Sequence, residues 1–232
     1  MLRRDILNNT LVWKGKTAEQ MGLKIISLPP IQISTEKVEE KELDGRDGTL
    51  TFVTGYTSDE KPVEADYRGS NPMEIANWLQ GSGEVIFGNL SDRYYKARIN
   101  NVIPISQVLQ SYLYTFQVKF KCQPFGYLLN GKKLRPIPSS GTVLNNPGNH
   151  ESLPIIKCYG SGRSTLIING TNYTITNIDN SITLDCAEEN VLDNKGEFFE
   201  SEEFPKLIVG KNTISWNGGI TKVDIIPNWR CL

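Results

Sequence analysis

The chain has 232 residues, 38% hydrophobic and 22% charged, so it can bury a core and is not a disordered polyelectrolyte. Its 25 lysines and arginines against 26 acids argue against nucleic acid or an anionic membrane as a partner, because both attract a clustered basic excess. No apolar run reaches the about 18 residues of a membrane-spanning helix, and the N-terminus lacks a signal peptide's apolar core. We therefore expect no membrane insertion and synthesis in a cytoplasm.

The first distinctive stretch is "ELDGRDGTLTF", which runs from Glu42 to Phe52 and holds two Asp-Gly pairs around an arginine. Such a loop suits a phosphate cradle, a metal loop or a corner between strands. A phosphate cradle needs a helix after the loop, whereas "TLTFV" has a strand pattern. We therefore predict a strand–turn–strand corner, with glycines where φ must be positive. Since an exposed arginine pairs well with a carboxylate, Asp44, Arg46 and Asp47 are candidates for a subunit contact, with a free surface charge at Arg46 as the alternative.

One helix and one clear strand are predicted in the rest of the first half. The helix covers residues 72–80, with Pro72 in its first turn and Ile75, Trp78 and Leu79 on one apolar face. The segment "LYTFQVKFKC", residues 113–122, alternates apolar and polar side chains, which indicates a half-buried strand.

A domain boundary is predicted after this strand. Residues 130–141, "NGKKLRPIPSSG", are rich in proline, glycine, serine and basic residues, which is the composition of a linker. We therefore predict an N-terminal domain over residues 1–130 and a C-terminal domain over residues 131–232.

Short strand patterns separated by turn residues fill the second half and indicate a β-sandwich. Asn169-Gly170 is the strongest hairpin signal, Asp179-Asn180 is a weaker turn, and Asn217 to Gly219 predicts a third hairpin. The fold class predicted from the residues is therefore all-β with one short helix.

The sequence offers no catalytic centre. The single histidine, His150, lies in a loop pattern and is expected to be solvated, and the common hydrolase and nucleotide-binding motifs are missing. The four cysteines, Cys122, Cys158, Cys186 and Cys231, lie too far apart for paired zinc ligands and are expected to be buried thiols. The acidic stretch of residues 185–203 is expected to be a solvated loop. We predict no enzymatic activity, no metal and no cofactor.

At this point the sequence resembles a known family, the distal tail proteins of long, non-contractile-tailed bacteriophages. The resemblance is carried by "ELDGRDGTLTF", "FQVKFKCQPFGY", "NPG" and the closing "FPKLIVGKNTISWNGGITKVDIIPNWRCL". The family shows a G-R-D-G loop, a strand ending in C-x-P-[FY], an N-x-G turn opening the C-terminal domain, and a G-x-N-x-[IL] strand before a P-x-[WY]-R tail. Together these phrases span nearly the whole chain.

The resemblance implies an N-terminal β-sandwich or split-barrel ring domain and a C-terminal galectin-like, or carbohydrate-module-like, β-sandwich. It also implies a hexameric ring hub at the virion tail tip, a baseplate component assembled in the bacterial host cytoplasm and used in host adsorption. The implied partners are further copies of the chain, the tail tube protein, and a tail-tip fibre or tail-associated lysin protein. DNA would pass through the lumen without specific binding.

Passage of DNA predicts an acidic or neutral lumen, because a basic lining would hold phosphates. Residues 36–44, "EKVEEKELD", are a candidate for the lumen or for the contact between neighbouring copies.

The alternative function is a carbohydrate-binding module that recognises a host glycan through the C-terminal sandwich. Sugar sites stack aromatic rings on pyranose faces, and Tyr173, Trp216 and Trp229 are the candidate contacts. Core packing is the competing role for these rings, since Trp216 alternates in phase with Ile214. A cell-wall hydrolase is a third alternative that no motif supports.

Overall fold

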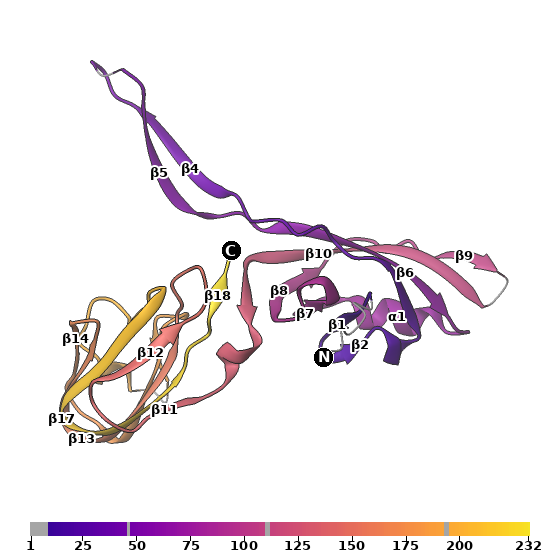
Figure 1. Ribbon diagram of the computed structural model, residues 1–232. Helices are drawn as coiled ribbons and strands as arrows, with labels where there is room; N and C mark the ends of the chain where they lie inside the picture. Colours follow the sequence, from indigo (N-terminus) through magenta and orange to yellow (C-terminus); the bar gives the residue numbers. More distant parts are fainter. Residues whose placement is uncertain (1–8, 46, 110–111, 193–194) are drawn as a thin grey trace, which may run out of the picture. The chain divides into compact units, whose positions relative to one another are not determined.

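The structure, a computed structural model, describes residues 9–45, 47–109, 112–192 and 195–232. The chain divides into two compact units, Met1–Gly126 with Leu232 (unit 1) and Tyr127–Cys231 (unit 2). The described residues are mostly strand with one α-helix, which confirms the predicted all-β class (Figure 1).

Unit 1 is built on one curled sheet with a separate two-stranded ribbon. Its elements are β1 (Leu11–Trp13), β2 (Lys16–Thr17), η1 (Glu19–Met21), β3 (Leu23–Ser27), β4 (Glu36–Glu42), β5 (Thr49–Tyr56), β6 (Asp59–Arg68), α1 (Pro72–Leu79), β7 (Gly81–Phe87), η2 (Gly88–Leu90), β8 (Arg93–Ile99), β9 (Ser106–Leu109) and most of β10 (Leu113–Leu128). The sheet has the strand order β2-β1-β7-β8-β10-β6-β3, with β9 also paired to β10, whereas β4 and β5 pair only with each other among the described strands.

The longest ladder of unit 1 joins β6 and β10, which are antiparallel from Leu113↔Arg68 to Cys122↔Asp59. The apolar positions of the predicted 113–122 strand, Phe116, Val118 and Phe120, are buried, and the polar positions between them are exposed. The predicted half-buried strand is therefore confirmed, and it continues to Leu128.

The helix α1 closes the core of unit 1. It begins at Pro72 as predicted, and its Ile75 and Leu79 are buried. The indole Nε1 of Trp13 donates a hydrogen bond to the backbone carbonyl of Trp78 at 3.0 Å. The same Trp13 ring meets Phe120 edge to face with the ring centroids 5.2 Å apart. One buried indole thus joins the helix to the sheet.

Unit 2 is a sandwich held by two long strands. Its elements are η3 (Leu129–Lys132), β11 (Arg135–Ile137), β12 (Thr142–Asn146), β13 (Ile155–Ile168), β14 (Thr171–Ile175), β15 (Asp179–Asp185), β16 (Asn190–Val191), η4 (Gly196–Phe198), β17 (Gly210–Ile226) and β18 (Arg230–Cys231). The first half of β13 and the second half of β17 form one layer with β11, β15 and β16. Their other halves form the second layer with β12 and β14.

Both long strands bend at glycines where the two layers meet. The β13–β17 register shifts between Tyr159 and Ser164, opposite Gly218 and Gly219. Sheets turn such corners through bulges and bends. The core of unit 2 lies between the layers and draws on both, with Ile156 and Val223 from one layer and Leu166 and Ile214 from the other.

The three turn predictions of this half had different outcomes. The Asn169-Gly170 hairpin is confirmed, because it joins β13 to β14 with positive φ at both residues, 53° and 85°. The Asp179-Asn180 turn is wrong, since both residues open β15 and pair with β13. The hairpin predicted at Asn217 to Gly219 is also wrong, because β17 bends there but continues through these residues as one strand.

Residues 130–141, predicted as a linker, lie inside unit 2. They include most of η3 and the strand β11, which pairs with β17 at the edge of its sheet. The proline pattern fits an edge strand, because Pro136 has no N–H to donate and an edge leaves that side of the strand unpaired. The compact units meet between Gly126 and Tyr127, a few residues before the predicted boundary.

Candidate functional site

The β4–β5 ribbon is the most exposed regular element of unit 1 (Figure 1). Its strands pair antiparallel from Glu42↔Thr49 to Glu36↔Tyr56, and all residues of β4 are exposed. An isolated two-stranded ribbon is marginal in water, and strands with open edges readily pair with another chain. The ribbon is therefore our first candidate for an interaction surface.

The tip of this ribbon holds the predicted subunit contact. Asp44 and Asp47 are exposed at the turn between the two strands, and Arg46 lies outside the described residues. Gly45 and Gly48 have φ of 81° and 83°, a region that residues with a Cβ rarely enter. The predicted strand–turn–strand corner is therefore confirmed, and the contact itself stays a prediction.

The two faces of the ribbon differ in charge. The cross-strand pairs Val38↔Val53, Glu40↔Thr51 and Glu42↔Thr49 place these side chains on one face, and Glu36 shares it by strand alternation. We call this the acidic face, because its three carboxylates have no cation beside them on either strand. The opposite face, the Phe52 face, holds Glu39↔Phe52 and Lys41↔Leu50, with Lys37 also on it by alternation.

Large apolar side chains on the ribbon were missed from the sequence. Phe52 is 52% exposed, Val53 54% and Val38 49%. The segment "EKVEEKE" suggests a solvated strand, and only the pairing of Val38 with Val53 reveals an apolar patch within it. Such side chains are typical of surfaces that a partner covers.

The aromatic residues predicted to contact a glycan are mostly in the core of unit 2. Tyr173 is 8% exposed and Trp229 is 2% exposed, and burial raises the pKa of the Tyr173 hydroxyl. Trp216 is partly buried against the same core, and its backbone N–H donates to Ser140 Oγ at 2.9 Å. The three rings do not form an open stacking platform.

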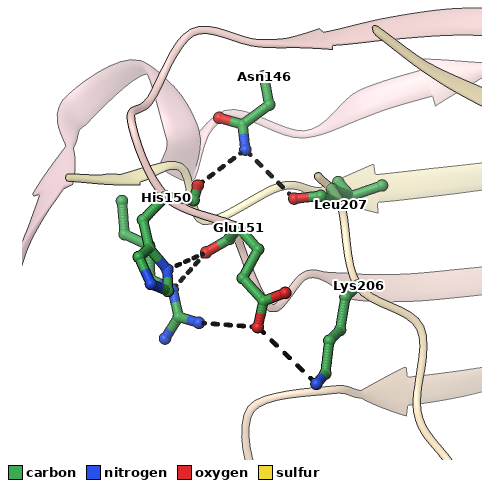
Figure 2. A network of polar contacts seen from close by, with 6 residues as sticks. Asn146, His150, Glu151, Lys206 and Leu207 are labelled. Carbon is green, nitrogen blue, oxygen red and sulfur yellow. Dashed lines mark hydrogen bonds and ion pairs between the residues drawn. The ribbon is translucent and has the colours of Figure 1, made fainter. Parts of the chain in front are cut away.

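Two asparagines from the motifs that carry the family resemblance are buried. They belong to "NPG", residues 146–148, and to "GKN", residues 210–212. The first is Asn146, whose Nδ2 donates to the carbonyls of His150 at 3.1 Å and Leu207 at 3.2 Å (Figure 2). Its Oδ1 accepts the backbone N–H of Gly148 at 2.9 Å. Asn146 therefore folds its own loop and fastens it to the segment before β17.

The second is Asn212, which is completely buried. Its Oδ1 accepts the backbone N–H of Ile208 at 2.8 Å and the Nδ2 of Asn169 at 2.9 Å. Its Nδ2 donates to the carbonyls of Ile208 at 2.9 Å and Gly210 at 3.0 Å. The asparagine of the G-x-N-x-[IL] phrase is thus a structural residue.

The single histidine belongs to a polar cluster around Glu151 (Figure 2). His150 is half-buried, and its Nδ1 lies 3.2 Å from the carbonyl oxygen of Glu151, which also accepts a hydrogen bond from Arg230 Nε. The Glu151 carboxylate lies 3.8 Å from Lys206 Nζ and 3.9 Å from Arg230 Nη2. This cluster ties the loop after β12 to β18 and to the segment before β17.

All four cysteines are buried free thiols, as predicted. Burial raises the pKa of Cys122 and of Cys158 to about 12, and it also raises the pKa of Cys186. Only the thiolate is a good nucleophile, so these side chains are unreactive near neutral pH.

The thiols give a prediction about labelling and pH. We expect the folded chain to resist iodoacetamide at pH 8 and to become alkylated at Cys122, Cys158 and Cys186 only in urea, as read by mass spectrometry. Because their folded-state pKa lies above the ordinary 9.0, the unfolded chain releases these protons first as pH rises. Stability is therefore expected to fall as pH rises from about 9 towards 12. Rapid labelling of the folded chain would contradict the burial.

No site for a metal or a membrane span emerges in the described residues. No three His, Cys, Asp or Glu side chains within them lie together as metal ligands would. None of their helices is long and apolar enough to cross a membrane.

The comparisons with known proteins identify the fold. No protein-family model matches the chain, and no curated protein sequence does either. Among solved structures, the crystal structure of the Dit protein (gp 19.1) of phage SPP1 aligns with a TM-score of 0.70 and 13% identity, over 93% of this chain and 96% of that chain. That protein is described as a paradigm of the hub adsorption apparatus in phages that infect Gram-positive bacteria.

Two chains of the activated phage p2 baseplate, with calcium and with strontium, align at TM-scores of 0.48 and 0.49. They are 9% and 7% identical, and the alignments cover 93% of this chain and 97% and 96% of those chains. The match to SPP1 Dit covers both units, so the predicted resemblance to distal tail proteins is confirmed for the fold.

Proposed function

We propose that this chain is a distal tail protein, a structural hub at the tip of a phage tail. Copies of unit 1 close into a hexameric ring between the tail tube and the tip apparatus, and DNA leaves through its lumen. The exposed β4–β5 ribbon, with its open edges and its apolar side chains, is the observation that best supports self-association. The fold shared with SPP1 Dit supports the place in the tail.

The chemistry of the chain supports a role without catalysis. The cysteines are buried thiols, the histidine is part of a structural cluster, and the motif asparagines bind backbone groups. Glycan binding by unit 2 has weaker support, because Tyr173 and Trp229 are in the core.

Labelled virions test the place of the protein. Gold-labelled antibodies against this chain are expected to mark the distal end of the tail in electron micrographs of virions that carry it. Label on the capsid, along the whole tube or nowhere on the particle would contradict the proposed role. The same antibodies on tube-only particles provide the background control.

A further inference from the structure

One layer of unit 2 carries charged and aromatic side chains together on its outer face. Lys157 of β13 lies directly opposite Asp224 of β17, and Tyr159 lies directly opposite Lys222. Because side chains alternate along a strand, these four point away from the core, into which Val223 points between two of them. We call these four residues the Tyr159 cluster.

Asp224 is nearly completely buried although it points outward, with 5% of its surface exposed. Its Oδ2 lies 3.0 Å from Nζ of Lys222, whereas its buried Oδ1 accepts no hydrogen bond from any described residue. An acceptor that is buried without a partner is costly, and a charged one more so than a neutral one. A ligand that brings a hydroxyl donor to this oxygen recovers that cost.

The tyrosine ring lies among cations. Nζ of Lys157 lies 5.2 Å from the centroid of the Tyr159 ring and Nζ of Lys222 lies 4.8 Å from it, both within cation–π range. A further ammonium lies on the neighbouring strand, where Ser181 pairs with Tyr159 and its carbonyl accepts a hydrogen bond from Lys195 Nζ at 2.8 Å. The cluster can therefore attract an anion as well as a hydroxyl donor.

These two requirements define the chemical class of the ligand. A simple anion would satisfy the lysines but brings no donor to Asp224, and a neutral saccharide would leave the ammonium groups unused. A saccharide with an acidic group places that group and a hydroxyl on one rigid ring, which suits Lys157 and Asp224 on strands about 4.8 Å apart. A flexible acidic peptide would lose more conformational entropy in making the same contacts.

We propose that the Tyr159 cluster binds an acidic saccharide. A ligand hydroxyl donates to Asp224, and the acidic group, a carboxylate or a phosphate, pairs with Lys157 and Lys222. The site uses neither Tyr173 nor Trp229, which are in the core. It is independent of ring assembly, so its failure would leave the proposed hub function untouched.

Isothermal titration calorimetry on the full chain tests the site with trigalacturonic acid as the probe. Asp224→Ala is expected to weaken its binding at least about 10-fold, because the acceptor for a ligand hydroxyl is lost. Tricarballylate, which has three carboxylates and no hydroxyl, is the paired probe, and the same variant is expected to bind it as well as the wild type or better, since a negative charge is gone. Attraction of anions alone would instead strengthen the binding of both probes.

Two lysine variants provide the matched comparison. Lys222→Ala is expected to weaken the binding of trigalacturonic acid at least about 10-fold. Lys211→Ala is the control, because it removes the same charge from an exposed position of the same strand in the other layer, and it is expected to bind like the wild type. Circular dichroism checks the fold of each variant. If Asp224→Ala does not fold, the wild type decides, because it must bind trigalacturonic acid at least about 10-fold more tightly than tricarballylate.

Further probes distinguish the source of the acidic group and the class of ligand. Mannose 6-phosphate carries a phosphate in place of a carboxylate, and binding of either acidic saccharide supports the proposal. The proposal is overturned if neither binds at millimolar concentrations, or if Lys211→Ala weakens binding as much as Lys222→Ala. It is also overturned if neutral maltotriose or the peptide triglutamate binds as tightly as trigalacturonic acid.

Discussion

We expect Gly219→Ala to lower the free energy of unfolding of unit 2 by about 4 kcal/mol or more. A Cβ at Gly219 would lie 1.7 Å from the backbone carbonyl oxygen of Ser161, which has no rotamer to change. A second contact between the two strands is nearly as close, since a Cβ at Gly160 would lie 2.0 Å from the carbonyl oxygen of Gly219. The substitution therefore forces β13 and β17 apart where both strands pass between the layers.

Urea unfolding followed by hydrogen exchange measures this effect. Peptides from β13 and β17 are expected to exchange faster in Gly219→Ala, whereas peptides from β6 keep their protection. Gly196→Ala is the matched control, because a Cβ at Gly196 meets no atom within 4 Å and the residue lacks the positive φ that would strain an alanine. If the two variants unfold at the same urea concentration, the strands do not approach as closely as described.

Asn212→Ala is expected to lower the free energy of unfolding of unit 2 by about 3 kcal/mol. The change removes four hydrogen bonds inside a completely buried site and leaves backbone groups of Ile208 and Gly210 unpaired. For a unit of this size the melting temperature should fall by roughly 12 °C or more, as calorimetry would show.

The control for this variant is Asn217→Ala, on the same strand at an exposed position. It is expected to stay within about 0.5 kcal/mol of the wild type. Equal melting temperatures for the two asparagine variants would mean that the motif residue is kept for another reason, such as contact with a partner.

Local patterns in the sequence predicted those elements that depend only on residues close together in the chain. The alternation of residues 113–122 requires only that one face of a strand is buried, and Phe116, Val118 and Phe120 are on that face. The Asn169-Gly170 turn follows from two residues that tolerate positive φ. The helix at Pro72 follows from its apolar spacing and its starting proline.

The failed predictions depend on partners far away in the sequence. Asn217 to Gly219 has hairpin composition, but its glycines serve a close approach to Ser161 and Arg163 on another strand. The prolines of residues 130–141 are typical of a linker until β17 is known to pair beside them. Whether a proline-containing strand lies at an edge depends on the assembled sheet, which no local pattern reveals.

The candidate site was predicted in part for the same reason. Two Asp-Gly pairs were enough to predict the ribbon's turn at Asp44 and Asp47. The exposed apolar side chains of the ribbon were missed, because Phe52 and Val53 have the composition of ordinary strand residues. Their importance lies in being left uncovered, and exposure is a property of the folded unit.

The mass of the assembled particle tests the central claim, that copies of this chain close into a ring. Light scattering of the purified chain, alone and mixed with the tube and tip proteins of the same phage, is the measurement. The predicted result is a particle that contains six copies of the 26.0 kDa chain, which together contribute about 156 kDa. We expect this six-copy ring either for the chain alone or within its complex with a partner. A 26.0 kDa monomer that also binds neither the tube nor the tip protein would contradict the account.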